Sequence, residues 1–525
     1  MLVVDSQLSP PSLSLQPFLL PFSITNSQLN FSIKNLNKNK NKNIITNNIT
    51  KSRTDMGNMK KCQKGYSNII ILVPYPAQGH VTPMLKLANS LLSQGFRPLL
   101  VTPEYIHNQI ARQIEAESAI ICASIPDGID EKRPRDFFAI EEAMEKNMPC
   151  HLERLVCELG DGVVACMVVD LLASWAIGVG NRCRVPVTGF WPVMLATYRL
   201  ILAIPDMVRS GLISDAGSPR QHSAVRFLPN QPILSTEELP WLIGTQVARK
   251  ARFKFWTRTL SRLTTLKWVL VNSFPDEFQH QNRLTTNPPN PNLPLLLPIG
   301  PLTNHSQTKN PTFREEDKSC LKWLDKQRPN SVIYISFGSW VSPIGESKIR
   351  SLAMALESVG HFFIWVLGSS WRSGLPGGFV ERVAEKGKIV SWAPQMEVLR
   401  HKSVGVYLTH CGWNSTLEAI QCRKRLLCYP IAGDQFMNCN YIVRVWKIGV
   451  RIGGFGKKDV EGGLRKLGED KEMGDRLKKM YQRTMGDEAG FRARDNLRAF
   501  KDFLGKQTVL GSSFDDEGNE DVDEI

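Results

Sequence analysis

The chain contains 525 residues, carries a formal net charge of +15 and is 42% hydrophobic. This length exceeds what one hydrophobic core supports, and it indicates two domains of about 200 residues each with terminal extensions. The positive charge suits an anionic ligand, but no helix-turn-helix, zinc-finger or aromatic RNA-binding pattern accompanies it, so we expect no nucleic-acid partner.

The eleven cysteines form no Cys-x-x-Cys pair and have no histidine partners at zinc spacing. Such a distribution indicates reduced thiols rather than disulfides or a metal site. We therefore expect a cytoplasmic protein without a bound metal.

Residues 1–60 are rich in Ser and Asn and include a low-complexity Asn/Lys run, so we expect them to be disordered. The apolar patch at 17–24 is interrupted by Pro21 and has no basic residue before it, which makes it a poor signal peptide or membrane anchor. A hydroxyl-rich, basic segment is also typical of a transit peptide, and Met56 or Met59 is an alternative start. These interpretations stay open.

The first predicted strand is the apolar run 68–73, and a helix is predicted from Thr82 onwards. His80 lies in the turn between them, which in an open α/β sheet is at the carboxyl edge where ligands bind. The adjacent helix N-terminus disfavours an imidazolium and keeps His80 available as a neutral base. A single histidine more often has a structural role. No Gly-x-Gly-x-x-Gly follows the strand, which argues against a dinucleotide-binding domain.

A second strand at 163–169 ends in Asp170, which places a carboxylate at the same edge as His80. An Asp bound to one imidazole nitrogen fixes the tautomer and stabilises the cation that forms when the other nitrogen takes a proton. Asp170 is also a candidate helix cap, and both roles are compatible.

Beyond Trp191 the chain is rich in aromatic and aliphatic residues up to about Lys267, and we predict helices and loops over an acceptor pocket. Strand character resumes at 266–272, and residues 285–315, dense in Pro, Asn and Thr, indicate an interdomain linker. In the second half, strands alternate with helices, and Ser339 in the turn after the first of them is a candidate phosphate or sugar contact. The predicted strands are 332–337, 362–366, 388–391, 404–409 and 426–429. This alternation predicts an α/β fold with two facing Rossmann-like domains.

The stretch 392–435 has the features of a nucleotide-sugar site. A buried strand is followed by a small-residue turn and by an apolar helix that opens at Ser415. The free backbone N–H groups of Asn414 and Ser415, with the helix dipole, can hold a diphosphate without a metal, and His410 can donate one more hydrogen bond.

The residues that flank this turn suit the rest of a nucleotide sugar. Trp392 offers a flat face for a base, and Glu418 can accept from both ribose hydroxyls. Asp434 and Gln435 remain for sugar hydroxyls. Taken singly, Ser415 and Glu418 are also an ordinary capping box, and Trp392 is also a plausible core residue.

Taken together, the segment 392–435 resembles the donor-binding signature of plant family-1 UDP-glycosyltransferases. The resemblance extends over about residues 66–504, is close to the subfamily numbered 82A, and implies the glycosyltransferase-B fold. The implied donor contacts are Trp392 and the Ala393 backbone to uracil, Gln395 and Glu418 to ribose, His410, Asn414 and Ser415 to phosphate, and Trp413, Asp434 and Gln435 to the sugar, with Gly412 in the turn.

The chain departs from the family pattern in two places. Arg423-Lys424-Arg425 replaces a small Gly-Val-Pro turn, which puts the local loop shape in doubt. Gly189-Phe190-Trp191 stands where many members have Thr residues near the sugar, which removes one candidate contact.

The resemblance implies an enzyme that transfers a hexose from a UDP-sugar to a hydroxyl of a small lipophilic plant metabolite, with inversion and without a metal. His80 is the implied base and Asp170 its partner acid. A Gln at 435 accompanies glucose donors in this family, so UDP-glucose is the expected co-substrate and we expect no further cofactor. We also expect a monomer without a transmembrane segment that acts in secondary metabolism.

Two alternatives belong to other classes. A non-catalytic nucleotide-sugar binding protein of the same fold would keep 392–435 but lose the base, and the presence of both His80 and Asp170 argues against it. A membrane-bound lumenal glucuronosyltransferase requires a signal peptide and a C-terminal span of about 20 apolar residues.

The predicted domain organisation has six parts. These are a disordered extension at 1–60, an acceptor-binding Rossmann-like domain at 61–300, a linker at 301–315, a UDP-sugar-binding Rossmann-like domain at 316–485, a C-terminal helix at 486–506 that packs back on the first domain, and an acidic tail at 507–525.

Overall fold

The computed structural model describes residues 68–225, 231–274, 293–302, 313–339 and 344–512. The described residues belong to one compact unit, Gly65–Ile525. The predicted N-terminal extension, most of the predicted linker and residues 513–525 of the acidic tail lie outside the described residues, so those predictions stay untested.

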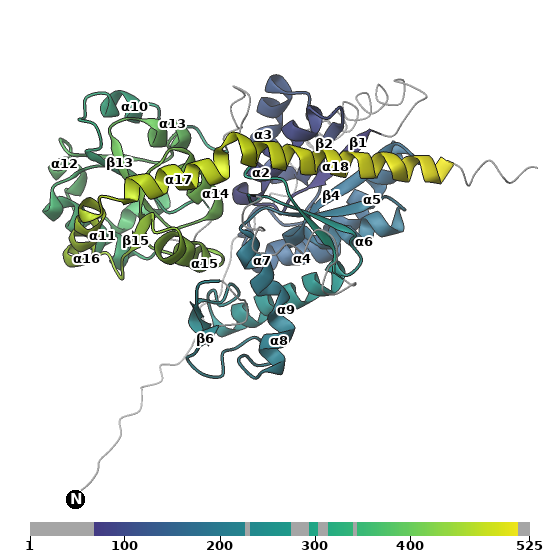
Figure 1. Ribbon diagram of the computed structural model, residues 1–525, viewed down its shortest axis with the longest axis horizontal. Helices are drawn as coiled ribbons and strands as arrows, with labels where there is room; N and C mark the ends of the chain where they lie inside the picture. Colours follow the sequence, from purple (N-terminus) through teal and green to yellow (C-terminus); the bar gives the residue numbers. More distant parts are fainter. Residues whose placement is uncertain (1–67, 226–230, 275–292, 303–312, 340–343, 513–525) are drawn as a thin grey trace, which may run out of the picture. The chain divides into compact units, whose positions relative to one another are not determined.

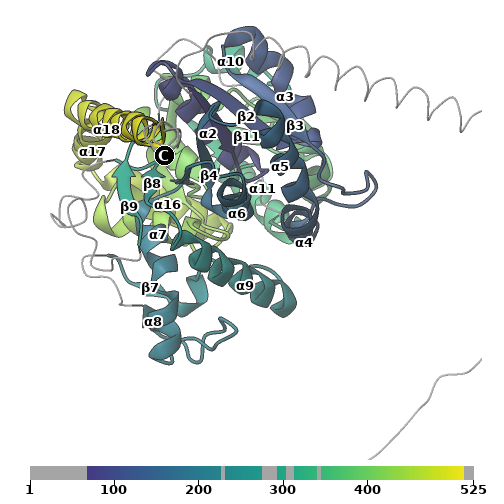
Figure 2. The same ribbon diagram turned by 90° about the vertical axis from the view of Figure 1, so that its right-hand side faces the viewer.

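The first half of the chain forms a seven-stranded, all-parallel sheet with the order β3-β2-β1-β4-β5-β8-β9 (Figure 1, Figure 2). Every residue of the central strand β1 is buried, which is typical of a parallel sheet covered by helices on both faces. The strands are β1 (Ile69–Val73), β2 (Arg97–Pro103), β3 (Ile121–Ile125), β4 (Val164–Asp170), β5 (Val187–Trp191), β8 (Trp268–Val271) and β9 (Leu295–Pro298).

His80, the predicted catalytic base, lies within a helix rather than in the turn before it. α2 begins at Gln78 rather than Thr82, so His80 lies in its first turn and Pro83 lies inside the helix. The others are α3 (Glu104–Glu117), α4 (Phe137–Glu142), η1 (Ala143–Asn147), α5 (Met148–Leu159), η2 (Leu171–Ala173), α6 (Trp175–Arg182), α7 (Leu195–Leu202), α8 (Ile204–Arg209), η3 (Thr236–Glu238) and α9 (Gln246–Leu263). A small antiparallel pair, β6 (Ala224–Val225) and β7 (Leu234–Ser235), precedes η3.

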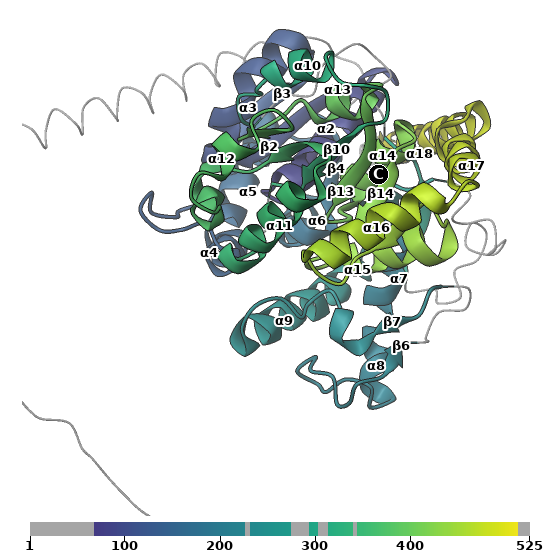
Figure 3. The same cartoon turned by 90° about the vertical axis from the view of Figure 1, so that its left-hand side faces the viewer.

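The second half forms a six-stranded parallel sheet with the order β12-β11-β10-β13-β14-β15 (Figure 3). The five predicted strands are present within one residue at either end, and β15 is an additional edge strand of three residues. Their bounds are β10 (Val332–Ser336), β11 (Phe362–Val366), β12 (Gly387–Val390), β13 (Val404–Thr409), β14 (Arg425–Cys428) and β15 (Gly449–Arg451). The two parallel sheets confirm the predicted α/β class with two Rossmann-like halves.

Helices connect the strands of this second sheet. They are α10 (Ser319–Leu324), α11 (Glu346–Val359), η5 (Ser369–Gly374), α12 (Phe379–Arg382), α13 (Gln395–Arg400), α14 (Trp413–Gln421), α15 (Gln435–Asn440), η6 (Tyr441–Val445) and α16 (Lys457–Glu469). α11 contacts α16, and α13 and α14 contact each other, so the connections pack on the sheet rather than projecting from it.

The C-terminal region contains two helices. The helix predicted at 486–506 corresponds to α18 (Asp487–Ser512), and α17 (Met473–Met485) precedes it, separated by Gly486 in an extended conformation. α18 also continues past residue 507, where the acidic tail was predicted to begin. α17 contacts α14 and β14, whereas α18 contacts β4 and β9 of the first sheet.

The predicted linker is also shorter than the composition of 285–315 indicates. Residues 295–298 form β9, which pairs with β8 as the last strand of the first sheet. Asn496 of α18 donates a 2.8 Å hydrogen bond to the carbonyl of Pro298 at the end of this strand. A proline-rich composition therefore did not prevent an edge strand, where a missing N–H costs no ladder hydrogen bond.

In the part of the chain that the structure describes, no helix combines the length and apolar character needed to cross a membrane.

The core position of α18 generates a stability prediction. Phe500 is fully buried in the hydrophobic cluster of the first sheet, whereas Phe491 of the same helix is 57% exposed. We expect Phe500→Ala to lower the free energy of unfolding by about 3–5 kcal/mol because it leaves a cavity. Phe491→Ala, the matched control, should change it by less than about 1 kcal/mol. Urea unfolding measures both, and equal losses would contradict the packing of α18 on this sheet.

Candidate active site

His80 and Asp170 meet at the carboxyl edge of the first sheet. His80 Nδ1 and Asp170 Oδ2 are 2.7 Å apart, and Asp170 is fully buried. Asp170 Oδ1 accepts a 2.9 Å hydrogen bond from the backbone N–H of Leu172 and so caps η2. Asp170 therefore makes both predicted contacts at once, one to His80 and one as a helix cap. The Tyr75 ring packs edge-on against the His80 ring at 5.1 Å and limits its orientation.

The helix that carries His80 is tied to the donor segment through a carbonyl that Pro83 leaves free. A residue in a helix donates its N–H to the carbonyl four positions earlier, and Pro83 has no N–H to give to Gly79. Asn414 Nδ2 donates a 2.9 Å hydrogen bond to this Gly79 carbonyl. Asn414 was predicted as a phosphate contact. In this structure its side-chain amide joins the first turn of α2, which carries His80, to the turn between β13 and α14.

The phosphate turn connects β13 to α14. α14 begins at Trp413 with Gly412 as N-cap, two residues earlier than predicted, so Ser415 lies in the first turn and is no cap. Cys411 has a φ of +65°, a conformation held by a hydrogen bond from its N–H to Thr409 Oγ1 and one from Asn438 Nδ2 to its carbonyl. The first N–H groups of α14 remain available for an anion.

His410 stands beside this turn in a slot that only glycine permits. A Cβ atom at Gly338 or at Gly412 would lie 2.7 or 2.4 Å from His410 Nε2. Burial lowers the pKa of His410 to about 4, opposed by a backbone hydrogen bond with Ser336. Within the described ranges its Nδ1 has no hydrogen-bond partner. The imidazole is therefore neutral and can donate one hydrogen bond to a ligand.

The two predicted ribose ligands contact each other. Gln395 Nε2 donates to Glu418 Oε2 at 2.7 Å and to Ser415 Oγ at 3.2 Å. Gln395 Oε1 accepts from the hydroxyls of Tyr334 and Tyr407 at 3.1 and 3.3 Å. This network replaces the capping box considered for Ser415 and Glu418, and it orients the Glu418 carboxylate.

The two residues predicted to bind uracil lie directly before α13. Trp392 is half-buried, and the guanidinium carbon of Arg314 lies 5.3 Å from the centroid of its ring. The Trp392 carbonyl accepts a hydrogen bond from the N–H of Asp317, and Ala393 is buried. Ser339 is half-buried and directly follows Gly338, so it lies next to the His410 slot.

Asp434 and Gln435 start α15, but only part of each side chain is available. Gln435 Oε1 accepts from the N–H groups of Ile431 and Ala432 at 2.9 and 3.0 Å, which leaves its NH2 group as a donor. Asp434 Oδ2 accepts a 2.8 Å hydrogen bond from Asn438. Burial raises the pKa of Asp434, and hydrogen bonding to Asn438 and the nearby His80 oppose this.

The Trp413 indole, predicted as a sugar contact, makes a hydrogen bond within the protein. It is buried, and its Nε1 donates a 2.8 Å hydrogen bond to the carbonyl of Asn272 directly after β8. The Asn272 side chain in turn binds the carbonyl of Pro192 and the N–H of Leu302. The sugar contact of Trp413 stays a prediction, and the indole N–H is already occupied in this structure.

Several supporting residues were missed by the sequence analysis. They are Gly79, Asn272, Tyr334, Tyr407 and Asn438. Asn272 offered a signal, since it is a polar residue directly after an apolar strand that ends at the ligand edge. The tyrosines and Asn438 offered none, because apolar periodicity does not reveal which buried hydroxyl or amide has a polar partner.

The basic trio 423–425 lies away from the turn after β13. Arg423 takes the left-handed conformation, with a φ of +52°, at the place where the family pattern has glycine. Lys424 is buried and donates to the carbonyls of His401 and Val404 at 3.1 and 2.6 Å. Arg425 begins β14, at the amino edge of the sheet, and donates to the carbonyl of Leu467.

Cysteines are free thiols throughout the described ranges. Cys411, Cys428 and Cys439 are buried with their sulfur atoms within 4.8 Å of one another, a grouping that their sequence spacing did not reveal. Burial raises the pKa of Cys411 and of Cys428, whereas hydrogen bonds from these two thiols lower the pKa of Cys439 to about 5. A single thiolate is therefore favoured, fewer than a metal held by three cysteines requires. The expected absence of a metal stays a prediction.

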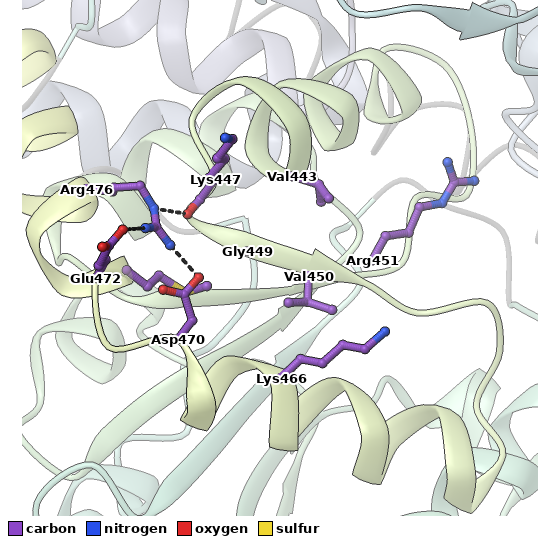
Figure 4. Close-up of a pocket in the computed structure, with 10 residues that line it drawn as sticks. Val443, Lys447, Gly449, Val450, Arg451, Lys466, Asp470, Glu472 and Arg476 are labelled. Carbon is purple, nitrogen blue, oxygen red and sulfur yellow. Dashed lines mark hydrogen bonds and ion pairs between the residues drawn. The ribbon is translucent and has the colours of Figure 1, made fainter.

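A separate hollow of about 560 Å³ lies beside β15, between η6, α16 and α17 (Figure 4). Arg476 donates to the carbonyl of Lys447 and pairs with Glu472 and Asp470, so its charge is matched. None of the predicted site residues lines this hollow. It is distinct from the site at the strand edges.

The comparisons with known proteins agree with this fold. Residues 285–481 match the family model described as UDP-glucoronosyl and UDP-glucosyl transferase. UDP-glycosyltransferase 82A1 of Arabidopsis thaliana is 56% identical over 455 residues, which cover 83% of this chain and 98% of that protein.

Solved structures share the architecture. UDP-glucose:anthocyanidin 3-O-glucosyltransferase in complex with UDP superposes with a TM-score of 0.70 at 25% identity, covering 84% of this chain and 100% of that one. Medicago truncatula UGT71G1 complexed with UDP-glucose gives a TM-score of 0.70 at 24% identity, covering 83% and 98%.

The two parallel Rossmann-like halves define the fold as glycosyltransferase-B, and the family match defines the class, an enzyme that transfers a sugar from a UDP-sugar. The chain belongs to the plant family-1 UDP-glycosyltransferases. The non-catalytic alternative is therefore set aside.

The buried His410 generates a prediction on acid stability. Its pKa of about 4 in the folded protein lies below the ordinary value of 6.5. Between pH 6.5 and pH 4, the His410 imidazole binds a proton in the unfolded chain but not in the folded protein. The contribution of His410 to the unfolding free energy is therefore fully present above pH 6.5 and is lost as the pH falls toward 4. The unfolding free energy of the wild type falls between pH 7 and pH 4. We expect this fall to be about 3 kcal/mol smaller in His410→Gln.

Urea unfolding at a series of pH values measures this difference. His361→Gln provides the control, because His361 is exposed. Identical pH dependence in wild type and His410→Gln would contradict a buried neutral imidazole.

Proposed function

We propose that this enzyme transfers glucose from UDP-glucose to a hydroxyl of a small lipophilic acceptor, with inversion at the anomeric carbon and without a metal. The observation that carries the proposal is the 2.7 Å contact between His80 and Asp170. The hydrogen bond of Asn414 to Gly79, next to this base, supports a site shared by both halves.

In the proposed step, His80 Nε2 takes the proton of the acceptor hydroxyl while Nδ1 is bound to Asp170. The acceptor oxygen attacks the anomeric carbon as the bond from that carbon to the UDP oxygen breaks. Asp170 stabilises the imidazolium that forms. One in-line displacement inverts the configuration.

The departing diphosphate is held by protein groups alone in this proposal. The first N–H groups of α14 and the neutral His410 face the developing charge, with Asn414, Ser415 and Ser339 beside them. Uracil stacks on Trp392 next to the Ala393 backbone, and the ribose hydroxyls bind Glu418 and Gln395. Gly412 keeps the turn open for His410.

Glucose is the proposed sugar because of the way Gln435 is held. Its carbonyl oxygen is bound to two backbone N–H groups, so its NH2 group is presented as a donor to a neutral hydroxyl, while Asp434 accepts. A glucuronate carboxylate near Asp434 would meet a like charge. The basic trio 423–425 offers no compensation from the amino edge of the sheet.

The free thiols of the described ranges support a cytoplasmic location. The aromatic side chains of α9 and β5 support a lipophilic acceptor. A monomeric state and a place in secondary metabolism stay predictions.

We expect His80→Ala to lower kcat by about 10²–10⁴-fold, because a general base contributes that much. The affinity for UDP, measured by calorimetry, should stay close to wild type since the proposed UDP contacts lie in the second half. Asp170→Asn should lower kcat by a smaller factor, because His80 is still present as the base. Wild-type turnover by His80→Ala would exclude the assignment.

We expect glucose to be the sugar incorporated when equimolar UDP-glucose, UDP-galactose and UDP-glucuronate compete. Mass spectrometry of the product identifies the hexose, and a screen of hydroxylated metabolites supplies the acceptor. Preferential incorporation of galactose or glucuronate would show that the roles given to Asp434 and Gln435 are wrong.

A further inference from the structure

The basic residues of α9 differ in whether a carboxylate matches them. Arg258 pairs with Glu141 of α4 at 2.6 Å and with Glu145 of η1 at 3.2 Å. Arg262 pairs with Glu145 at 2.7 Å and also reaches the hydroxyl of Ser174. These two arginines bind α9 to α4 and η1, and carboxylates of the protein match their charges.

Arg252, earlier on the same helix, has no such partner among the described residues. Its guanidinium carbon lies 4.0 Å from the centroid of the Phe137 ring, and its Nε is buried without a hydrogen bond. The nearby carboxylates are committed elsewhere, since Asp136 caps α4 and Glu141 pairs with Arg258. Burial lowers the pKa of Arg252, and the charges of Tyr75, Asp136 and Glu141 oppose this without forming an ion pair with it.

The Tyr75 ring, which packs against the His80 ring at 5.1 Å, also experiences the charge of Arg252. Burial raises the pKa of Tyr75, the Arg252 charge lowers it, and the Asp170 charge raises it. Arg252 and His80 therefore share Tyr75 as an electrostatic or ring neighbour.

The surroundings of Arg252 are aromatic. One turn later on α9, Trp256 lies 6.1 Å from Trp191, the last residue of β5, and β5 is the neighbour of the strand that carries Asp170. Phe255 packs edge-on against Phe137 at 6.0 Å. An unmatched cation among aromatic rings fits a ligand that is flat, apolar and anionic at one end.

We propose that Arg252 binds the carboxylate of the acceptor and that the preferred acceptors are aromatic hydroxy acids, held with the carboxylate at Arg252 and the hydroxyl at His80. This assignment rests on the proposed function, because it names the acceptor class of the same site. The guanidinium can give two parallel hydrogen bonds to a carboxylate, and the bound anion would supply the missing partner of Arg252.

The test compares acids with their own methyl esters. A panel of hydroxybenzoic and hydroxycinnamic acids and esters is assayed with UDP-glucose, and the ratio of kcat/KM for acid over ester is determined for each pair. We expect wild type to favour the acid and Arg252→Gln to lower the ratio by about 10-fold or more, mainly through KM. Arg252→Lys should retain part of the preference, because it keeps the charge but not the fork.

Lys254→Gln is the matched control, because it removes the same charge from an exposed position of α9 and should keep the wild-type ratio. Calorimetric binding of acid and ester to the UDP complex gives the same comparison without turnover, and thermal unfolding verifies that each variant folds. A wild-type preference for esters, or an equal ratio in Arg252→Gln, would overturn the proposal. Turnover of esters without a preference for acids would overturn the role of Arg252 but leave the proposed function standing. Binding of UDP without turnover of any hydroxylated compound would count against the proposed function itself.

Discussion

One carbonyl connects the two chemical halves of this enzyme. Pro83 cannot donate to Gly79, so a helix that would otherwise satisfy its own backbone offers an acceptor beside His80, and Asn414 takes it. Trp413, the preceding residue, makes a second hydrogen bond to the first half, to the carbonyl of Asn272 after β8. Two adjacent residues at the start of α14 therefore hold the turn after β13 against the first half, and one of them does so beside His80.

The donor segment depends on polar groups that are satisfied before any ligand arrives. Gln395 is held by two tyrosine hydroxyls, Ser415 and Glu418, and Gln435 by two backbone N–H groups. Buried amides without partners would cost about 1–3 kcal/mol each, so this bonding also fixes their orientation. A ligand then meets groups with few remaining degrees of freedom, which lowers the entropy cost of binding.

Several basic side chains away from the site are matched within the protein. Lys424 is buried under backbone carbonyls, and Arg258, Arg262 and Arg476 have carboxylate partners. At the phosphate turn, by contrast, N–H dipoles and a neutral imidazole replace cations. Dipoles held by the fold can meet a diphosphate as its charge develops without the solvent reorganisation that water would require.

The sequence by itself determined five strands of the second sheet, three strands of the first and the sheet edge at which His80 and Asp170 meet, because apolar periodicity and strand ends are local properties. It did not reveal β2, β3 and β5, and it placed the residues of β9 in a linker. Only the tertiary structure decided the start of α2 at Gln78, the hydrogen bond from Gln395 to Glu418 and the hydrogen bond from the Trp413 indole to the carbonyl of Asn272. These depend on partners far apart in the chain. A proline signals a helix start by its own chemistry, but which carbonyl it leaves free, and which side chain takes that carbonyl, follows from packing alone.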